Sequence, residues 1–236
     1  MVLYQPQNGY CYNSDTLFLY DFILQNLQKY KNPKGDLLDI GSGSGILGLL
    51  IAKSISDFKL HQVEIQDDFC FLSSKNAYTN KIDAILFEGD FLELDFDKKF
   101  DYIVSNPPFY HHASIKSENN SLKIARYNTN FSLDNFIQKV SKTLKPKGSL
   151  FFCYDVKQIN DIITTLSKYK FNLEAIRFVH PNKNKDASLV LIYAKKSSSS
   201  LLKVYPPFIV HKDDGYTKEA IELFIKANTH SIKVEI

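Results

Sequence analysis

Apolar and polar positions along the chain predict strands and helices in regular alternation. Short apolar runs bounded by polar or glycine residues are typical of buried strands, and apolar residues at helical spacing are typical of helices packed on a sheet. Strands are expected near residues 37–40, 59–64, 83–87, 100–105, 148–153, 174–180 and 187–195. Helices are expected near residues 14–30, 45–55, 67–79, 132–144 and 156–169. Such alternation predicts an α/β fold with a parallel, doubly wound sheet.

The 236 residues are enough for one α/β domain with a full core, and too few for a large accessory domain as well. We therefore expect a single domain with a core over residues 36–196. Residues 1–35, with the first amphipathic helix, form an N-terminal cap segment, and residues 197–236 form a C-terminal extension with a helical pattern from Thr217 to Ala227.

A glycine-rich loop follows the first core strand. Gly41, Gly43 and Gly45 come directly after this strand, and a helical pattern begins at residue 46. Glycines permit positive φ angles and let a ligand contact the backbone, and the N–H groups at a helix start face such a ligand. Glu64 ends the next strand, where a carboxylate commonly binds ribose hydroxyls. The loop predicts a nucleoside cofactor, and its fit to G-x-G-x-x-G leaves NAD open.

A second motif, Asn106-Pro107-Pro108-Phe109, follows the strand at 100–105. Each proline fixes its own φ, lacks an N–H group and favours an extended conformation of the preceding residue. The Asn106 side-chain oxygen and a main-chain carbonyl can then accept hydrogen bonds in one pocket, while Phe109 offers an aromatic face for stacking. The motif therefore predicts methylation of a planar amine, although a plain Asn-Pro turn explains the tetrapeptide equally well when it is taken alone.

Taken in order, Asp39, the glycine loop, Glu64, Asp90 and the Asn-Pro-Pro-Phe peptide resemble the amino-directed S-adenosylmethionine methyltransferases. A dehydrogenase has no use for the last of these features. The resemblance implies a Rossmann-like class I methyltransferase fold, with a seven-stranded, mostly parallel sheet and helices on both faces. The last strand, near 187–195, is then expected to run antiparallel to its neighbours.

The same resemblance assigns roles to individual residues. Asp39 and the three loop glycines would hold the methionine part of S-adenosyl-L-methionine, with Asn106 also beside the cofactor. Glu64 would bind the ribose, Asp90 the adenine amine, and Phe91 would flank the adenine ring. Catalysis would rest on the tetrapeptide of Asn106, Pro107, Pro108 and Phe109.

Further segments resemble the bacterial tRNA1(Val) (adenine(37)-N6)-methyltransferase family. They are residues 4–10 with Asp15, the Ala125-Arg126-Tyr127 triplet, and the tail over 208–220. The resemblance implies transfer of a methyl group to the exocyclic N6 of an adenine in tRNA, next to the valine tRNA anticodon. Lys116, Lys123 and Arg126 in the loop after the catalytic peptide are candidate substrate-binding residues, with Lys183 and Lys185 in a second basic loop, because these loops are expected beside the base-accepting pocket. Tyr110 is a candidate second wall for the base.

Three alternatives stay open at this point. An N5-glutamine protein methyltransferase uses the same tetrapeptide but usually carries a helical domain before the glycine loop. A guanine-N2 ribosomal RNA methyltransferase often duplicates the domain. A non-catalytic S-adenosylmethionine-binding or RNA-binding protein is expected to have lost Asn106 or a proline, and this chain keeps all of them.

Composition narrows these possibilities modestly. The net charge of +3 permits contact with RNA without demanding it. The three cysteines lack C-x-x-C spacing, so no zinc or other metal site is expected, and His111 and His112 are expected to be ordinary loop residues. No apolar stretch is long enough to cross a bilayer and the start lacks a signal pattern, so we expect a cytoplasmic protein, with a monomer as the default.

Overall fold

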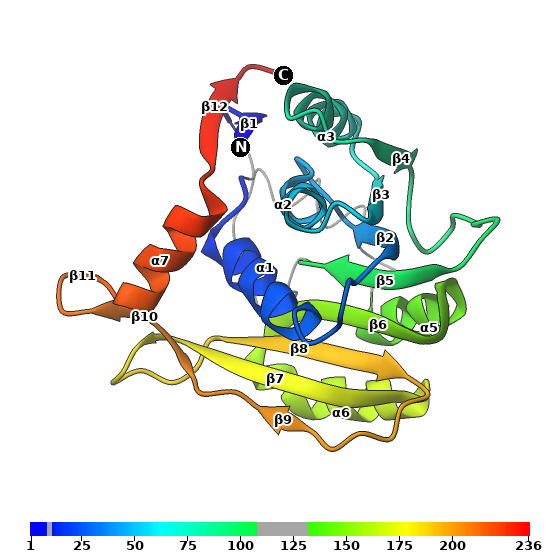
Figure 1. Ribbon diagram of the computed structural model, residues 1–236, viewed down its shortest axis with the longest axis vertical. Coiled ribbons are helices and arrows are strands. Elements are labelled where there is room, and N and C mark those ends of the chain that lie inside the picture. Colours follow the sequence, from blue (N-terminus) through cyan, green and yellow to red (C-terminus); the bar gives the residue numbers. More distant parts are fainter. Residues whose placement is uncertain (9–10, 108–131) are drawn as a thin grey trace.

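The computed structural model describes residues 1–8, 11–107 and 132–236, and these form a twisted sheet with helices on both faces (Figure 1). Each strand predicted from the sequence is present. In chain order they are β2 (Gly35–Ile40), β3 (Phe58–Glu64), β4 (Ala84–Glu88), β5 (Phe100–Ser105), β6 (Leu144–Asp155), β7 (Phe171–Asn182) and β8 (Leu189–Lys196). They lie side by side in the order β7-β8-β6-β5-β2-β3-β4.

Strand directions agree with the predicted class. β2, β3, β4, β5 and β6 pair in parallel, whereas β8 is antiparallel to both β6 and β7. The antiparallel last strand is therefore confirmed. The sheet continues beyond the predicted strands, because β10 (Phe208–Lys212) pairs in parallel with β7 and β11 (Gly215–Tyr216) forms a hairpin with β10. β9 (Lys203–Val204) also pairs with β7.

Helices cover the two faces of the sheet with separate hydrophobic clusters. On one face, α1 (Ser14–Leu27), α2 (Ile46–Ser54), α3 (Asp67–Thr79) and α7 (Lys218–Ala227) contribute buried residues to a single cluster. On the other face, α5 (Leu133–Thr143) and α6 (Ile159–Lys168) supply apolar residues at helical spacing, such as Phe136 and Val140, to the second cluster. Ser132 caps α5 by accepting a hydrogen bond from the backbone N–H of Asn135, as its sequence predicts.

The chain ends meet beside the sheet. β1 (Val2–Pro6) pairs in parallel with β12 (His230–Val234), so the two termini form a separate two-stranded sheet. Asn76 in α3 and Asn80 just after its end hold β1 from its other side: Asn80 bonds both the N–H and the carbonyl of Val2, and Asn76 does the same for Tyr4. Asn76 also donates to the Ser44 carbonyl at 2.8 Å. The N-terminal strand is thereby tied to the glycine loop.

The carboxyl ends of the parallel strands lie at one edge of the sheet, where ligands bind in open α/β sheets. Ile40 at the end of β2 is in register with Val63 of β3 and Ser105 of β5. The glycine loop, Glu64 and Asn106 follow directly from these three strand ends.

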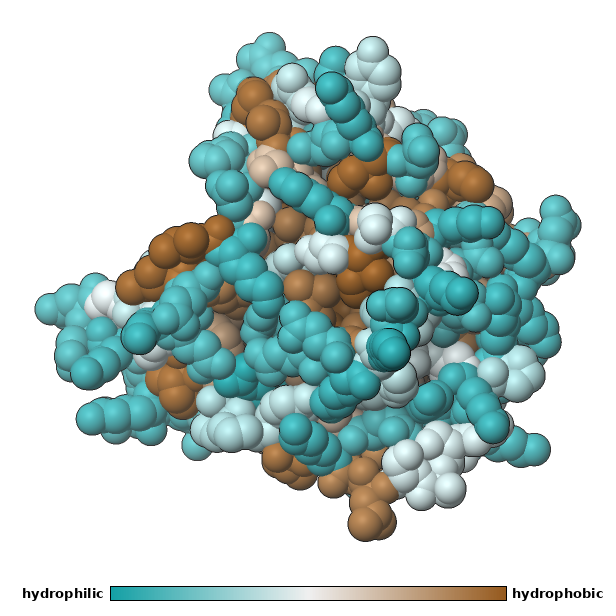
Figure 2. All heavy atoms as spheres, in the orientation of Figure 1, coloured by the Kyte–Doolittle hydropathy of each residue, from teal (hydrophilic) through white to brown (hydrophobic). Residues whose placement is uncertain are grey.

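The face of the molecule shown in Figure 2 is mostly hydrophilic, with separate hydrophobic patches. One patch lies over α7, where the side chains of Ile221 and Ile225 are exposed, and another lies near β9, where Leu201 and Val204 are exposed. Across the described parts of the chain, no helix is both long and apolar enough to span a bilayer.

Candidate active site

The glycine loop has the backbone conformation that its sequence requires. Gly41, Gly43 and Gly45 have φ angles of 64°, 54° and 85°, in the left-handed region that favours glycine. A Cβ atom at Gly41 or Gly43 would meet nothing within 4 Å, so both face open space. At Gly45 a Cβ would lie 2.8 Å from Gln62 Nε2 and 2.9 Å from Ser73 Oγ, so this third glycine packs against β3 and α3.

Asp39 lies beneath the loop, near the end of β2, with an exposed fraction of 1%. Its Oδ2 accepts a hydrogen bond of 2.9 Å from the backbone N–H of Gly48. Burial, assisted by the nearby Glu64 charge, raises the pKa of this carboxyl to about 7. A buried carboxylate of this kind favours a cationic ligand, whose charge stabilises the ionised form.

Glu64 joins the loop to the end of β3. Its Oε2 accepts a hydrogen bond of 2.8 Å from the N–H of Gly43, and its Oε1 accepts from the N–H groups of Ile65 and Gln66 at 2.9 and 3.0 Å. Its side chain is thus held in place on both oxygens. Each carboxylate oxygen has two lone pairs, so further acceptor capacity toward a ligand hydroxyl remains.

Asp90 and Phe91 follow the end of β4. Asp90 is half-buried, and its Oδ1 accepts a hydrogen bond of 2.9 Å from the N–H of Leu92. Phe91 has an exposed fraction of 3% and packs in an aromatic group with Phe96 and Phe136. The residue before Asp90 is bonded to the end of β3, because the Gly89 N–H donates a hydrogen bond to the Glu64 carbonyl. This bond fixes the position of the chain at Asp90.

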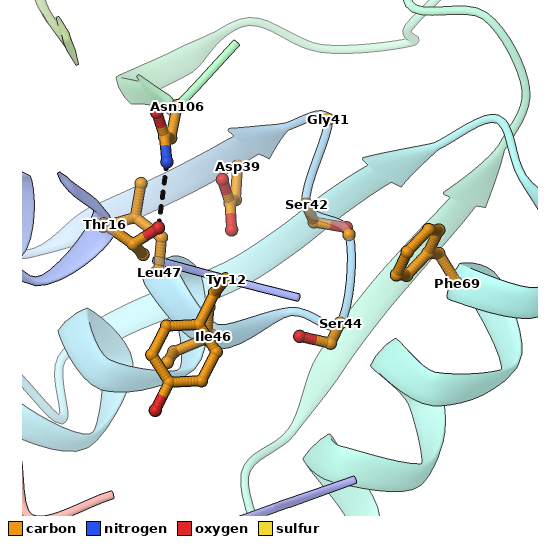
Figure 3. Close-up of a pocket in the computed structure, with 11 residues that line it drawn as sticks. Tyr12, Thr16, Asp39, Gly41, Ser42, Ser44, Ile46, Leu47, Phe69 and Asn106 are labelled. Atoms are coloured by element: carbon orange, nitrogen blue, oxygen red, sulfur yellow. Dashed lines mark hydrogen bonds between the residues drawn. The ribbon is translucent and has the colours of Figure 1, made fainter. Parts of the chain in front are cut away.

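Asn106 follows β5, and both ends of its side-chain amide have partners. Nδ2 donates to Thr16 Oγ1 on α1 at 2.9 Å, as the dashed line in Figure 3 shows. Oδ1 accepts from the Cys153 thiol on β6 at 2.9 Å. Burial, assisted by the charge of Asp15, raises the pKa of Cys153 well above its usual value, so the group stays a thiol and donates. Pro107, beside Asn106, is buried.

These elements surround one cleft (Figure 3). Asp39, Thr16 and Asn106 face it from β2, α1 and the end of β5. The residues that line it are Tyr12, Thr16, Asp39, Gly41, Ser42, Gly43, Ser44, Ile46, Leu47, Phe69 and Asn106. Four predicted site residues, Asp39, Gly41, Gly43 and Asn106, therefore come together in it. Gly45, Glu64, Asp90 and Phe91 are not among the residues that line it.

The predicted residues Pro108, Phe109, Tyr110, Lys116, Lys123 and Arg126 lie outside the described residues, as do His111 and His112. Lys183 and Lys185 are exposed at the tip of the β7–β8 hairpin. Because β8 is antiparallel to β6 and Leu189 pairs with Asp155, this hairpin lies toward the same edge of the sheet as Asn106.

Several cleft residues were not predicted from the sequence. Thr16 lies on the buried face of α1 among apolar neighbours, and a polar residue at a core position was the available signal. Tyr12 and Phe69 also line the cleft, but neither belongs to a recognisable sequence motif. The Ser42 hydroxyl is buried and has no hydrogen-bond partner within the described residues. An unpartnered buried hydroxyl beside two open glycines fits a polar ligand bound along the loop.

Comparison with known proteins identifies the family. The family model described as the Methyltransferase small domain matches residues 20–179. The chain belongs to this methyltransferase family. A tRNA1(Val) (adenine(37)-N6)-methyltransferase of Pedobacter heparinus is 25% identical over 170 residues, covering 70% of this chain and 71% of that protein. The resemblance to such enzymes seen in the sequence is confirmed.

Other relatives have different substrates in their names. A release factor glutamine methyltransferase of Flavobacterium psychrophilum is 27% identical, covering 71% of this chain and 63% of that protein. Among solved structures, a predicted O-methyltransferase from Agrobacterium tumefaciens matches with a TM-score of 0.68 at 17% identity, covering 93% of this chain and all of that one (100%). This likeness confirms the predicted fold class.

The chain is thus an S-adenosyl-L-methionine-dependent methyltransferase, as predicted. The residues present fit this cofactor. The open glycines, the buried Asp39 carboxylate and the unpartnered Ser42 hydroxyl provide a loop, a negative charge and a polar group along one cleft. Membership in this methyltransferase family decides between S-adenosyl-L-methionine and NAD, which the glycine pattern alone left open.

Proposed function

We propose that this methyltransferase modifies the exocyclic N6 of an adenine in tRNA, next to the anticodon of valine tRNA. The observation that carries the proposal is the position of Asn106, which lines the same cleft as Asp39 and the open glycines of the loop. An acceptor held by Asn106 would therefore lie next to a cofactor held by the loop. The names of relatives, at about a quarter identity, support tRNA as the substrate.

In this proposal Asp39 and the glycine loop hold the amino-acid end of the cofactor, because a buried carboxylate favours a cationic partner. Glu64, already oriented by three backbone N–H groups, accepts from the ribose hydroxyls. Asp90 accepts from the adenine amine, and Phe91 flanks the adenine ring. When bound, S-adenosyl-L-methionine supplies an electrophilic methyl group on a positively charged sulfur.

The residues of the chain would activate the acceptor by position. The lone pair of an adenine amine is shared with the ring and is poorly nucleophilic. Hydrogen bonds from the amine to Asn106 Oδ1 and to the Pro107 carbonyl favour a pyramidal nitrogen with a localised lone pair. No strong base is needed, because the nitrogen becomes acidic once it carries the methyl group. Phe109 would stack on the unstacked base, a contact worth about 1–3 kcal/mol.

Substrate recognition is the second part of the proposal. Lys116, Lys123 and Arg126 follow the catalytic peptide in the sequence, and Lys183 and Lys185 lie toward the same edge of the sheet. Basic residues around a base-accepting cleft provide phosphate contacts that position a nucleic acid without reading its sequence.

A second candidate is a protein glutamine, and one observation favours it: a release factor glutamine methyltransferase is among the relatives, at 27% identity. The amide of a glutamine side chain is also a planar –NH2 group, so Asn106 could hold it in the same way. A guanine-N2 ribosomal RNA substrate is the third outcome that an experiment should distinguish.

Mass spectrometry of tRNA nucleosides from cells that lack this gene tests the proposal. We expect N6-methyladenosine to be lost from valine tRNA and restored by the parent gene, but not by the Asn106→Ala variant. If tRNA is unchanged and a methylated protein glutamine is lost instead, glutamine is the substrate. If a methylated guanine of ribosomal RNA is lost instead, that guanine is the substrate.

A further inference from the structure

The Asn106 side chain is held from two elements that do not belong to the glycine loop. Thr16 projects from the first turn of α1, and Cys153 from the carboxyl end of β6. Each forms one hydrogen bond of 2.9 Å with the Asn106 amide, Thr16 with Nδ2 and Cys153 with Oδ1. The exposed fractions of Thr16 and Cys153 are 3% and 0%, so both partners are buried, while Asn106 itself is half-buried where it lines the cleft.

The chemistry of the two partners determines which way the amide points. A hydroxyl can donate or accept, so Thr16 tolerates either end of the amide. A thiol is a weak donor and its sulfur is a weak acceptor, and Cys153 remains protonated because it is buried and lies near Asp15. Cys153 therefore favours the amide oxygen. The flipped amide would direct an N–H group at a sulfur that already carries its own proton.

We propose that Thr16 and Cys153 are positioning residues that clamp the Asn106 amide, with Cys153 selecting the orientation in which Oδ1 is the acceptor for the substrate amine. This inference rests on the proposed role of Asn106 in amino methyl transfer. Oδ1 has two lone pairs and the bond from Cys153 uses one, so in this proposal the second accepts the hydrogen bond from the substrate amine. The clamp therefore fixes the orientation of the amide and leaves Oδ1 able to accept one more hydrogen bond.

The clamp separates acceptor alignment from cofactor binding. Neither Thr16 Oγ1 nor Cys153 Sγ hydrogen-bonds Asp39, Glu64 or the loop glycines within the described structure. Loss of the clamp should therefore lower kcat while the affinity for S-adenosyl-L-methionine stays as it is. A misplaced reacting group commonly costs up to about 100-fold in rate, which sets the scale of the effect.

Matched pairs of variants test the clamp. Cys153→Ser keeps a donor and Cys153→Ala removes it, while Thr16→Ser keeps the hydroxyl and Thr16→Val removes it. Thr143→Val serves as a control, because Thr143 is equally buried but bonds its own helix α5, at the Lys139 carbonyl. For each purified full-length variant, kcat and KM are measured on the acceptor fraction that takes up label, cofactor Kd by calorimetry, and folding by thermal denaturation.

We expect Cys153→Ala and Thr16→Val to lose about 10- to 100-fold in kcat, with cofactor Kd within about twofold of the parent. The two serine variants and Thr143→Val should stay within about threefold of the parent in kcat. The clamp would be overturned if the serine variants lost as much kcat as the alanine and valine variants. It would also be overturned if the loss of kcat followed the melting temperature in every variant, Thr143→Val included. Either result would indicate a purely structural role for Thr16 and Cys153.

Failure of the clamp and failure of the proposed substrate give different results. If label enters a protein glutamine, the proposed tRNA substrate is wrong, but the same kcat pattern on that acceptor still supports the clamp. If label enters tRNA adenine and the serine variants are as impaired as the others, the substrate stands and the clamp is wrong. A protein that labels no acceptor fraction overturns both.

Discussion

The Asp39 carboxylate accepts a hydrogen bond of 2.9 Å from the backbone N–H of Gly48, which joins the end of β2 to the first turns of α2. This contact places a buried negative charge under the glycine loop, where burial raises the carboxyl pKa to about 7. The charge is costly for folding and useful for binding a cationic cofactor.

The first prediction concerns Asp39→Asn, which keeps an acceptor for Gly48 and removes the charge. The raised folded-state pKa means that the folded chain binds a proton more tightly than the unfolded chain between about pH 4 and pH 7. The free energy of unfolding of the parent should therefore fall as pH rises through this window, with the full cost present above pH 7.

Urea unfolding at pH 5 and pH 8 should show the variant gaining stability relative to the parent at the higher pH. Calorimetry should show S-adenosyl-L-methionine binding the variant about 10- to 100-fold more weakly, because a charge-assisted contact worth roughly 1.5–3 kcal/mol is lost. A stability difference that does not change with pH would contradict the raised pKa.

Gly48→Ala tests the close packing at the same contact. A Cβ at this position would lie 2.7 Å from Leu60 Cδ1 and 3.0 Å from Asp39 Oδ2, so the neighbours must shift. We expect a loss of about 1–3 kcal/mol in unfolding free energy, together with weaker cofactor binding. Gly215→Ala is the matched control, because a Cβ there meets nothing within 4 Å. Equal stability of the two variants would show that the Gly48 site has room.

Glu64→Ala and Asp90→Ala should each weaken cofactor binding, since each removes a charge-assisted hydrogen bond worth about 1.5–3 kcal/mol. Glu64→Ala should also lower stability, because three backbone N–H groups, including that of Gly43, lose their acceptor. Calorimetry and thermal denaturation separate the two effects. If the cofactor binds both variants as tightly as the parent, the proposed ribose and adenine contacts are misplaced.

Asn106→Ala should nearly abolish methyl transfer while cofactor affinity changes little, because Asn106 aligns the acceptor and not the donor. Single-turnover measurements with saturating cofactor give the rate, and calorimetry gives the affinity. A variant that retains most of its turnover would remove Asn106 from its assigned role.

Local patterns predicted the central elements well. The helix over 67–79 has the predicted bounds, and the strands that end at Glu64 and Ser105 end as predicted, because apolar runs and strand-ending motifs are local signals. The first helix ends at Leu27, earlier than predicted. The pairing of β1 with β12 was not predicted, because most β12 residues are exposed and show no alternation. The division into residues 1–35, 36–196 and 197–236 stays a prediction.

The candidate site was predicted as far as its motifs reach. Asp39, Gly41, Gly43 and Asn106 meet in one cleft because each follows or ends a parallel strand. Thr16 and Cys153 were missed, since they lie 90 and 47 residues from Asn106 and their contacts arise only from the packing of α1 and β6. A polar residue at a core position, such as Thr16, indicates an unusual environment but does not identify its partner.

Methyl incorporation from labelled S-adenosyl-L-methionine into separate tRNA, ribosomal RNA and protein fractions tests the central claim most directly. A Lys123→Ala, Arg126→Ala double variant is assayed in parallel at several salt concentrations, because phosphate contacts weaken as salt rises. We expect label in N6-methyladenosine of valine tRNA, with tRNA binding reduced in the double variant and cofactor binding intact. Label in a protein glutamine, or an RNA affinity that is indifferent to the double substitution, would contradict the account.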